Sequence, residues 1–402
     1  MDIPSVGDAH VFGFQDAAVD YIARARALAP VLTAAGPRID AARELPADMQ
    51  AAMHEAGMFR LLLPKSLGGA ELDPLTYVQC VEMIASGDGS AGWCMNQGSG
   101  CSMSAAYLDP DAAADVFGDP QAVLAWGQGP GARAERVDGG WIVTGKWLFA
   151  SGSRHASWLG CHALTYDADG TARTHLDGRP WEATMLVRRE QATVTDTWHV
   201  MGLRGTGSDQ YVVSGFFVPD RLTLTRDLAA ERRHPGLLYR FTTGNIYASG
   251  FGSVALGIAR GILDAFTRLA REKTPALTTT RLADSQVIQS QLAICEAKFA
   301  SARLFLHASL REAAEVLATR EALTLDERAK IRLASTFAIH QAREIVDFAY
   351  HEAGATAIFE SNVFERRFRD IHSVCQQVQG RTTHFETIGQ HLLGLPVSMR
   401  WL

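Results

Sequence analysis

The feature that most constrains this chain is a double change in the spacing of its apolar residues. From about residue 15 to 118 they recur at helical intervals, as in the stretch from Tyr77 to Ala85. From about 120 to 225 they fall in short β-rich runs separated by Gly-Gly and Asp-Gly turns. From about 240 onward the helical spacing returns. These changes predict a β segment held between two helical segments.

The last segment carries two long apolar stripes at helical spacing, one from Leu292 to Ala313 and one from Ala334 to Phe348. Stripes of this length are typical of a helix bundle. A chain of 402 residues also exceeds the usual size of one domain. We therefore expect an N-terminal helical domain (1–120), a middle β-barrel or sandwich domain (121–228) and a C-terminal four-helix bundle (229–402).

Composition narrows the classes of function. The 38 basic and 44 acidic residues are well mixed and give a net charge of −6, so no basic face for nucleic acid is expected. The six cysteines form no Cys-x-x-Cys pair, which argues against zinc sites and disulfide frameworks, and we expect no bound metal. No apolar run approaches about 18 residues, and the acidic N-terminus lacks the pattern of a secretory leader. We expect a cytoplasmic protein without a membrane span.

A glycine-rich stretch, Gly127 to Ala132, invites comparison with dinucleotide-binding loops. The third glycine is misplaced, Pro130 interrupts the stretch, and a turn and strand follow where that motif needs a helix. A Rossmann domain is therefore not expected. We expect instead a loop whose glycines bring the backbone close to a flat ligand.

The most specific passage runs from Pro130 to Gly152 and includes Gly139-Gly140-Trp141 and the Gly-x-Trp-x-Phe-x-Ser-Gly motif that begins at Gly145. It resembles the flavin-dependent monooxygenases built on the acyl-CoA dehydrogenase fold. The segment from Trp198 to Asp209 is similar to a signature of the whole superfamily. The resemblance implies an acyl-CoA dehydrogenase-like fold and a flavin cofactor.

The end of the chain departs from the dehydrogenases of this superfamily. Many of them take their catalytic base from a glutamate eight or nine residues past the arginine of an Arg-Asp pair. Between Arg369 and Gly394 the only carboxylates are Asp370 and Glu386, and the stretch from Gly244 to Leu263 has none. Losing a general base costs about two to four orders of magnitude in rate. We therefore expect oxygen chemistry in place of dehydrogenation.

The resemblance assigns residues around the flavin ring. It implies that Phe149 covers the ring and that Ser151 meets flavin N5, which gains or loses a proton when the flavin changes redox state. It also implies that Trp93 approaches the flavin or substrate. Further cofactor contacts are expected from Gly152 and Trp126, and substrate contacts from Trp93, Asn96, Tyr247 and Gln376.

Other assignments lie toward the C-terminus. Arg281 matches an arginine that binds the flavin pyrophosphate across a subunit interface, a task that suits its rigid fork of donors. Gly354 and Thr356 match a glycine turn that packs on a neighbouring subunit's flavin. Related monooxygenases place a catalytic histidine where this chain has Gln377. Gln377 and His372 therefore join Ser151 and Trp93 as the candidate catalytic residues, although an amide cannot accept a proton at neutral pH.

The function implied is the oxygenase component of a two-component flavin-dependent monooxygenase. It would take reduced flavin (FADH2 or FMNH2) from a separate NAD(P)H-dependent reductase, use O2 through a C4a-hydroperoxide, and hydroxylate a small aromatic or heteroaromatic molecule. A dry apolar pocket near Trp93, Phe149 and residues 372–380 would protect that species from water. A homotetramer is implied by the family. The alternatives are an acyl-CoA dehydrogenase with a displaced base and a non-catalytic flavin-binding homologue.

Overall fold

The computed structural model describes residues 17–175, 178–225 and 228–397. The N-terminal stretch on which the expectation about a secretory leader rests lies outside the described residues. The first region is helical and the second is a sheet, with bounds as follows: α1 (Ala17–Ala42), α2 (Ala47–Glu55), α3 (Pro74–Gly87), α4 (Gly89–Ser102), α5 (Pro110–Phe117); β1 (Leu124–Trp126), β2 (Arg133–Val137), β3 (Gly140–Ala150), β4 (Trp158–Tyr166), β5 (Glu182–Arg188), β6 (Thr193–Thr195), β7 (Asp209–Pro219), β8 (Thr223–Leu224).

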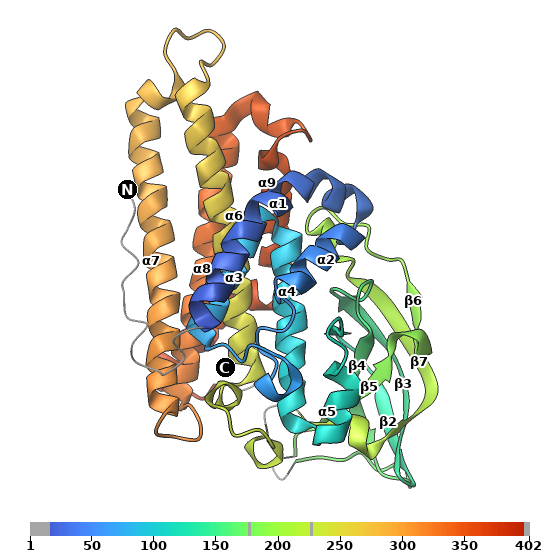
Figure 1. The fold of residues 1–402 in the computed structure, drawn as a ribbon. Helices are drawn as coiled ribbons and strands as arrows, with labels where there is room; N and C mark the ends of the chain where they lie inside the picture. The colour runs from blue at the N-terminus through green and yellow to red at the C-terminus, as the bar shows by residue number, and fades with distance from the viewer. Residues whose placement is uncertain (1–16, 176–177, 226–227, 398–402) are drawn as a thin grey trace.

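The third region is again helical, and its longer helices form the elongated body on the left of Figure 1. The sheet lies at the lower right of that view, beside α4 and α5. The order of helical, β and helical regions confirms the expected fold class, whereas the domain limits at 120 and 228 stay a prediction. The helices of this region are α6 (Thr243–Glu272), α7 (Gln286–Leu317), α8 (Leu325–Ala353), α9 (Val363–Gln376) and α10 (Thr383–Leu392).

Local capping sets where α3 and α4 begin. Pro74 opens α3, where its missing N–H costs nothing, and the Asp73 carboxylate accepts the amides of Leu75 and Thr76 at 3.0 Å. Asp88 follows α3 directly and accepts the Ala91 amide at 3.0 Å, so it caps α4. The chain thus turns sharply between the two helices, and α4 lies buried along its whole length.

The sheet has the strand order β6-β7-β3-β2-β4-β5-β8, with β1 added in parallel beside β4. Its centre is the antiparallel pair β3 and β7, in which Trp147 faces Tyr211 and the two rings stack at 5.2 Å. The register shifts between Trp147 and Ala150. This irregularity re-aims the end of β3, as bulges commonly do next to active sites.

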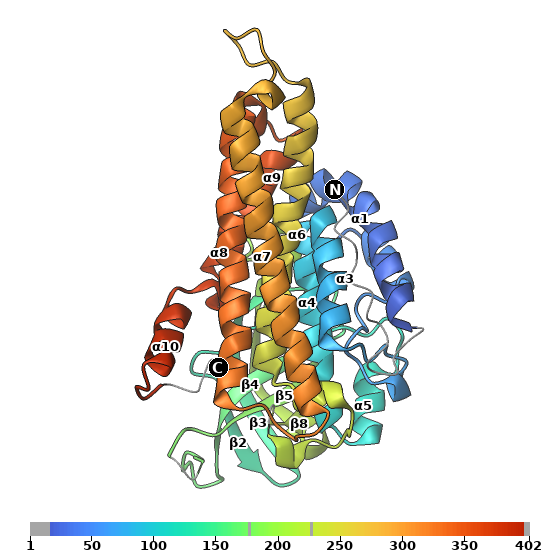
Figure 2. The same ribbon diagram turned by 90° about the vertical axis from the view of Figure 1, so that its left-hand side faces the viewer.

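Helix α6 is the central rod of the molecule and packs against α3, α4, α8 and α9. Among the described helices it alone is long and apolar enough to cross a membrane by length and composition, with a mean hydropathy of 1.4 over 18 residues. That window is 89% buried inside the protein, as in the core helix of a globular bundle. Figure 2 shows α6, α7 and α8 running alongside one another, with α10 lying outside them.

The glycine-rich loop packs against strand β3. A Cβ on Gly127 would lie 2.2 Å from the Leu148 carbonyl oxygen, and one on Gly129 would lie 2.3 Å from the Trp147 indole nitrogen. Both glycines therefore make room for the protein's own strand β3. This packing accounts for the two glycines. The expectation that the loop brings the backbone close to a flat ligand stays a prediction.

Candidate active site

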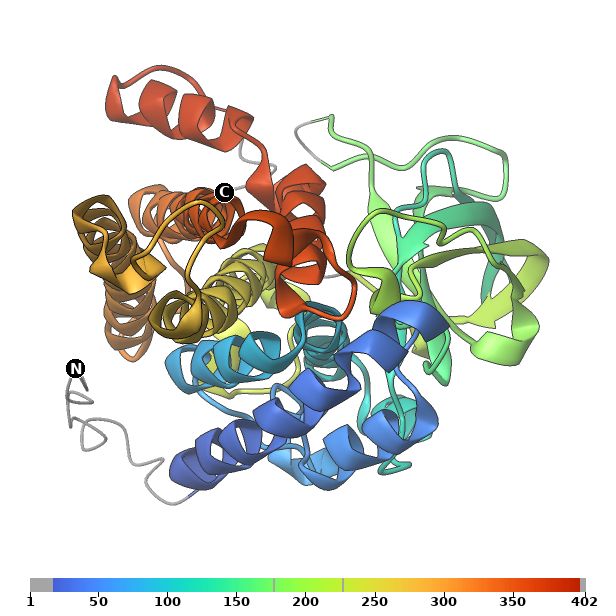
Figure 3. The ribbon, with the colours of Figure 1, turned by 90° about the horizontal axis from the view of Figure 1, so that it is seen from above.

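The site forms where α4 meets the loop after β3. Trp93 on α4 donates its indole N–H to the hydroxyl oxygen of Ser151 at 2.9 Å, and both side chains are buried. Gly152, at φ +80°, donates its amide to the Thr206 carbonyl at 2.9 Å and holds this loop against the 203–208 segment. Helix α4 packs against β1 and also against α3 and α6. Figure 3 shows the sheet at the right of the view, with the helices to its left and below it.

The Ser151 hydroxyl continues into a row of hydroxyl groups. Its oxygen lies 2.7 Å from the Ser208 hydroxyl oxygen, which lies 2.6 Å from that of Thr206. The Thr206 hydroxyl donates to the Leu203 carbonyl at 2.9 Å. All three hydroxyl side chains are buried. The β3 loop and the start of β7 are therefore joined by side chains as well as by the sheet.

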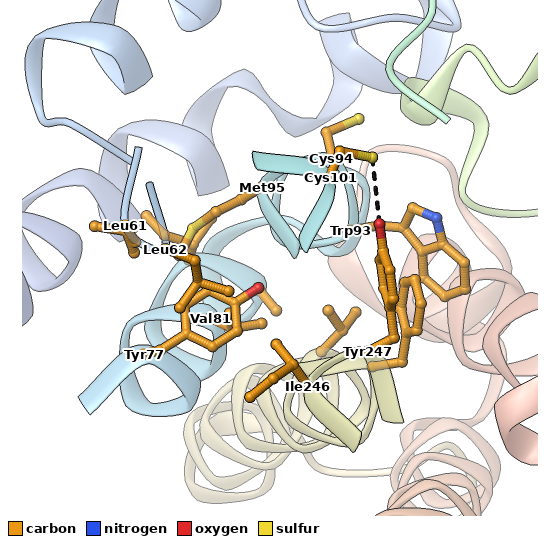
Figure 4. Packing of buried hydrophobic residues seen from close by; sticks show 14 of the residues in the cluster. Leu61, Leu62, Tyr77, Val81, Trp93, Cys94, Met95, Cys101, Ile246 and Tyr247 are labelled. Carbon is orange, nitrogen blue, oxygen red and sulfur yellow. Dashed lines mark hydrogen bonds between the residues drawn. The ribbon is translucent and has the colours of Figure 1, made fainter. Parts of the chain in front are cut away.

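Trp93 belongs to a cluster of aromatic side chains that come from α4, α6 and β1. The Phe251 ring centroid of α6 is 4.1 Å from that of Trp93, and Tyr247, one turn earlier, stacks on Phe251 at 5.8 Å. Trp126 of β1 lies 6.4 Å from Tyr247. Figure 4 shows Trp93 and Tyr247 side by side, with the tyrosine hydroxyl pointing to Cys101, 3.2 Å away. The cluster is apolar with one polar edge, a composition suited to a flat aromatic ligand.

Phe149 stands out at the irregular end of β3. Its backbone is left-handed at φ +60°, which is unusual for a bulky residue, and its side chain is 61% exposed. Its ring meets Trp198 edge to face at 6.3 Å. A strained backbone that presents a large apolar ring two residues from a buried hydroxyl is a feature of binding sites.

A half-buried histidine, His155, lies beside the same loop with its Nε2 atom buried. The Nε2 atom of His155 has no hydrogen-bond partner among the described residues and would lie 3.1 Å from a Cβ on Gly152. Burial, and to a lesser degree His54, lowers the pKa of His155 to about 4. The imidazole is therefore neutral at pH 7 and can accept or donate one hydrogen bond.

Asn96 lies away from this centre. It is fully buried, accepts the Tyr77 hydroxyl at 2.7 Å, and packs so closely on Gly250 that a Cβ there would lie 1.7 Å from its side-chain oxygen. These contacts belong to the packing of α3, α4 and α6. The contact of Asn96 with substrate therefore stays a prediction.

Arg281 lies in the connection between α6 and α7, and Gly354 and Thr356 follow α8. The connection between α6 and α7 lies at the end of the bundle that points away from the sheet (Figure 1). Arg281 is exposed and paired with Asp284 at 3.1 Å. Gly354 ends α8 at φ +57°, and the Lys273 ammonium donates to the Thr356 hydroxyl at 2.9 Å. The Leu282 amide, next to Arg281, donates to the Lys273 carbonyl at 2.9 Å, so Lys273 links this connection to Thr356. The flavin contacts of Arg281, Gly354 and Thr356 stay predictions.

The candidates on α9 face other neighbours. His372 Nε2 lies 2.9 Å from the Asp347 carboxylate of α8, and its ring packs on Phe368 at 4.4 Å. Gln377 ends α9, and its side-chain oxygen accepts the Gln379 amide at 2.7 Å. Gln376 is exposed. No contact of these side chains with Trp93 or Ser151 occurs among the described residues, so their catalytic and pocket roles stay predictions.

Comparison with known proteins identifies the family. Family models match the acyl-CoA dehydrogenase N-terminal domain over residues 19–109 and the acyl-CoA dehydrogenase C-terminal domain over residues 249–380. Indole-3-acetate monooxygenase of Pseudomonas putida is 30% identical over 359 residues, which cover 88% of this chain and 89% of the relative. The chain belongs to the flavin-dependent monooxygenases of the acyl-CoA dehydrogenase superfamily.

A further relative and a solved structure support the assignment. The oxygenase subunit HsaA of Rhodococcus jostii is 29% identical and aligns over 87% of this chain and 92% of its own. The solved structure of XiaF from Streptomyces sp. in complex with FADH2 and glycerol superimposes with a TM-score of 0.88 at 26% identity, covering 96% of this chain and 98% of XiaF. The predicted family and fold are therefore confirmed.

A flavin fits the residues of this monooxygenase. The exposed Phe149 ring offers an apolar face to a planar heterocycle, and the Ser151 hydroxyl and the unpartnered His155 nitrogen lie near by for its polar edge. The arginine and the glycine turn at the far end of the bundle are suited to its phosphates. Among the described residues no group of three or more His, Cys, Asp or Glu side chains is placed to hold a metal.

Several site residues escaped the sequence analysis. Ser208 and Thr206 lie in the superfamily signature, which was taken as a mark of fold alone, and Phe251 was assigned no role. His155 was likewise assigned no role. The Gly-Thr-Gly-Ser order at 205–208 was the available clue, because hydroxyl residues between glycines often lie in tight turns at sites.

Proposed function

We propose that this monooxygenase is an oxygenase component that takes reduced flavin and dioxygen and hydroxylates a small aromatic or heteroaromatic molecule. The observation that carries the proposal is the buried aromatic cluster of Trp93, Phe251, Tyr247 and Trp126 beside the Ser151 hydroxyl. Bound reduced flavin supplies the two electrons that activate dioxygen. One oxygen atom enters the aromatic ring and the other leaves as water.

The protein's own residues orient and protect the reactants. Trp93 holds the Ser151 oxygen in place, and the aromatic cluster keeps water out, which matters because solvent would divert reduced oxygen to hydrogen peroxide. Phe149 covers the flavin ring from the outside. Tyr247 and Cys101 form the polar edge where a hydroxyl or ring nitrogen of the substrate would be received.

Buried carboxylates around the Ser151 loop are engaged in structural contacts. Asp209, opposite Ala150 on β7, is paired with Arg154 at 2.8 Å. Asp370 accepts the Leu203 amide at 2.6 Å, and Asp88 caps α4 and lies 3.9 Å from the Arg366 guanidinium. Burial raises the pKa of the Asp370 and Asp88 carboxyl groups. None of these carboxylates is presented as a free base, which favours oxygenation over removal of a proton from an acyl thioester.

The proposal includes its partners. An NAD(P)H-dependent flavin reductase supplies FADH2 or FMNH2, and the protein works in the cytoplasm as a homotetramer. The distance between the Ser151 loop and Arg281, Gly354 and Thr356 is accounted for if the latter three contact the flavin of a neighbouring subunit. His372 and Gln377 are retained as candidate catalytic residues, to be tested by substitution.

The deciding experiment is turnover with chemically reduced flavin, oxygen and a panel of phenols and indoles, followed by product mass. A gain of one oxygen atom in product is expected. Bleaching of bound oxidised flavin by an acyl-CoA would identify a dehydrogenase instead. Oxygen consumption that yields only hydrogen peroxide with every aromatic in the panel would favour a non-catalytic flavin binder.

A further inference from the structure

Four side chains form one continuous hydrogen-bonded row through the site. The Trp93 indole, the hydroxyls of Ser151, Ser208 and Thr206, and finally the Leu203 carbonyl are joined by contacts of 2.9, 2.7, 2.6 and 2.9 Å. Each of these side chains is at most 6% exposed. Water therefore has little access, and the protons must be shared among the members themselves.

The two ends of the row decide the direction of every proton in it. An indole N–H can only donate, and a carbonyl can only accept. Thr206 has one hydroxyl proton and donates it to the Leu203 carbonyl. Thr206 is then an acceptor toward Ser208, so Ser208 donates to Thr206, and Ser151 in turn donates to Ser208. Ser151 also accepts from Trp93. One lone pair on the Ser151 oxygen then remains, and Ser151 can meet a ligand only as an acceptor.

The accepting end is held firmly. Leu203 has a left-handed backbone at φ +53°, which is uncommon for a branched apolar residue, and its amide donates to the buried Asp370 carboxylate at 2.6 Å. Its carbonyl also accepts the Trp198 indole N–H at 3.0 Å and the Thr206 amide at 3.2 Å. Because these contacts hold the Leu203 carbonyl in place, it provides a fixed acceptor at the end of the row.

We infer that Ser208 and Thr206 are positioning residues that hold Ser151 as a hydrogen-bond acceptor and so make the site discriminate between the redox states of flavin. The reduced ring carries an N–H at N5, which suits an acceptor, whereas the oxidised ring has a lone pair there, which an acceptor repels. The inference rests on the proposed function, since it takes Ser151 to meet N5. Oxidised flavin then dissociates from the site, and returns to the reductase, more readily than reduced flavin does.

The test compares dissociation constants for oxidised flavin and for anaerobically reduced flavin, with the whole protein. In Ser208→Ala the Ser151 proton loses its acceptor and turns to the ligand, so we expect the ratio of oxidised to reduced dissociation constants to fall about tenfold. Because that ratio is linked to redox energy, the midpoint potential of bound flavin should fall by about 30 mV. Thr206→Val should act in the same direction, and Thr206→Ser, which keeps the hydroxyl, should restore the ratio.

Ser153→Ala is the matched control. Ser153 lies in the same loop, is fully buried, and donates to the Gly207 carbonyl at 3.2 Å outside the row. Its loss should leave the ratio unchanged. A wild-type ratio retained in both Ser208→Ala and Thr206→Val would overturn the inference, with Thr206→Val serving alone if Ser208→Ala does not fold. Failure of the wild-type protein to bind flavin in either state would instead overturn the proposed function.

Discussion

The carboxylate of Asp370 on α9 accepts the backbone amide of Leu203 at 2.6 Å and so ties the C-terminal bundle to the loop before β7. Burial, followed by the nearby Asp88, raises the pKa of Asp370 to about 7. The folded protein therefore holds a proton on this group at pH values where the unfolded chain has released it.

That proton makes stability depend on pH. The stabilisation that protonated Asp370 contributes is fully present below about pH 4 and is lost as the pH rises to about 7. The free energy of unfolding should therefore fall by about 2 kcal/mol between pH 5 and 7.5. Asp370→Asn keeps an accepting oxygen but cannot titrate, and should flatten this slope. Urea unfolding at several pH values measures it. A slope equally steep in the variant would assign the proton to another group.

Trp93→Phe removes the indole donor to Ser151 while keeping an aromatic ring. We expect a loss of about 1–3 kcal/mol in stability, together with more hydrogen peroxide per product, because Ser151 is no longer held. Trp147→Phe is the control, since its buried indole donates to the His162 carbonyl at 3.0 Å away from the row. Equal uncoupling in both variants would point to general loosening of the fold.

Gly250→Ala should disrupt the packing of α4 on α6. The added Cβ would lie 1.7 Å from the Asn96 oxygen and break its hydrogen bond with Tyr77, at a cost of about 3 kcal/mol. Gly389→Ala in α10 has open space around its Cβ and should stabilise by about 0.5–1 kcal/mol through helix propensity. Thermal unfolding compares the two, and a neutral Gly250→Ala would mean that Asn96 can move aside.

His372→Ala tests the candidate catalytic histidine. The contact of His372 with Asp347 is partly exposed, so its loss should cost at most about 1 kcal/mol of stability. If His372 is a catalytic base, product formation should fall by about a hundredfold or more, which is the cost of losing a general base. A fall of less than about tenfold would contradict the catalytic role, and Asp347→Asn shows whether the contact orients the ring.

Arg281→Ala tests the flavin contact at the far end of the bundle. Its exposed pair with Asp284 contributes at most about 1 kcal/mol, whereas loss of a phosphate contact should weaken flavin binding about tenfold. Arg24→Ala, in a comparable exposed pair with Asp20, is the control. Titration of both variants with flavin measures the affinity. Equal affinity for Arg281→Ala and wild type would leave Arg281 as a surface charge.

Much of the architecture could be predicted from the sequence alone because it depends on near neighbours. Helical and strand spacing, the Pro74 start of α3 and the turns of the sheet are set by residues a few positions apart. The motif around Phe149 and Ser151 could likewise be recognised in the sequence, because it is a run of consecutive residues. The same holds for the stretch after Asp370, which has no carboxylate before Glu386. These features determined the fold, the family and the loop at which the site forms.

Only the tertiary structure decided which side chains meet. Hydrogen bonds join Trp93 to Ser151 across 58 positions of sequence and Ser151 to Ser208 across 57. His372 on α9 contacts Asp347 on another helix, α8. The glycines at 127 and 129 serve β3 because of how the sheet folds over them. A hydrogen bond depends on distance and direction between atoms that no local pattern encodes, so the hydrogen-bonded row through Ser151 forms only when these segments pack together.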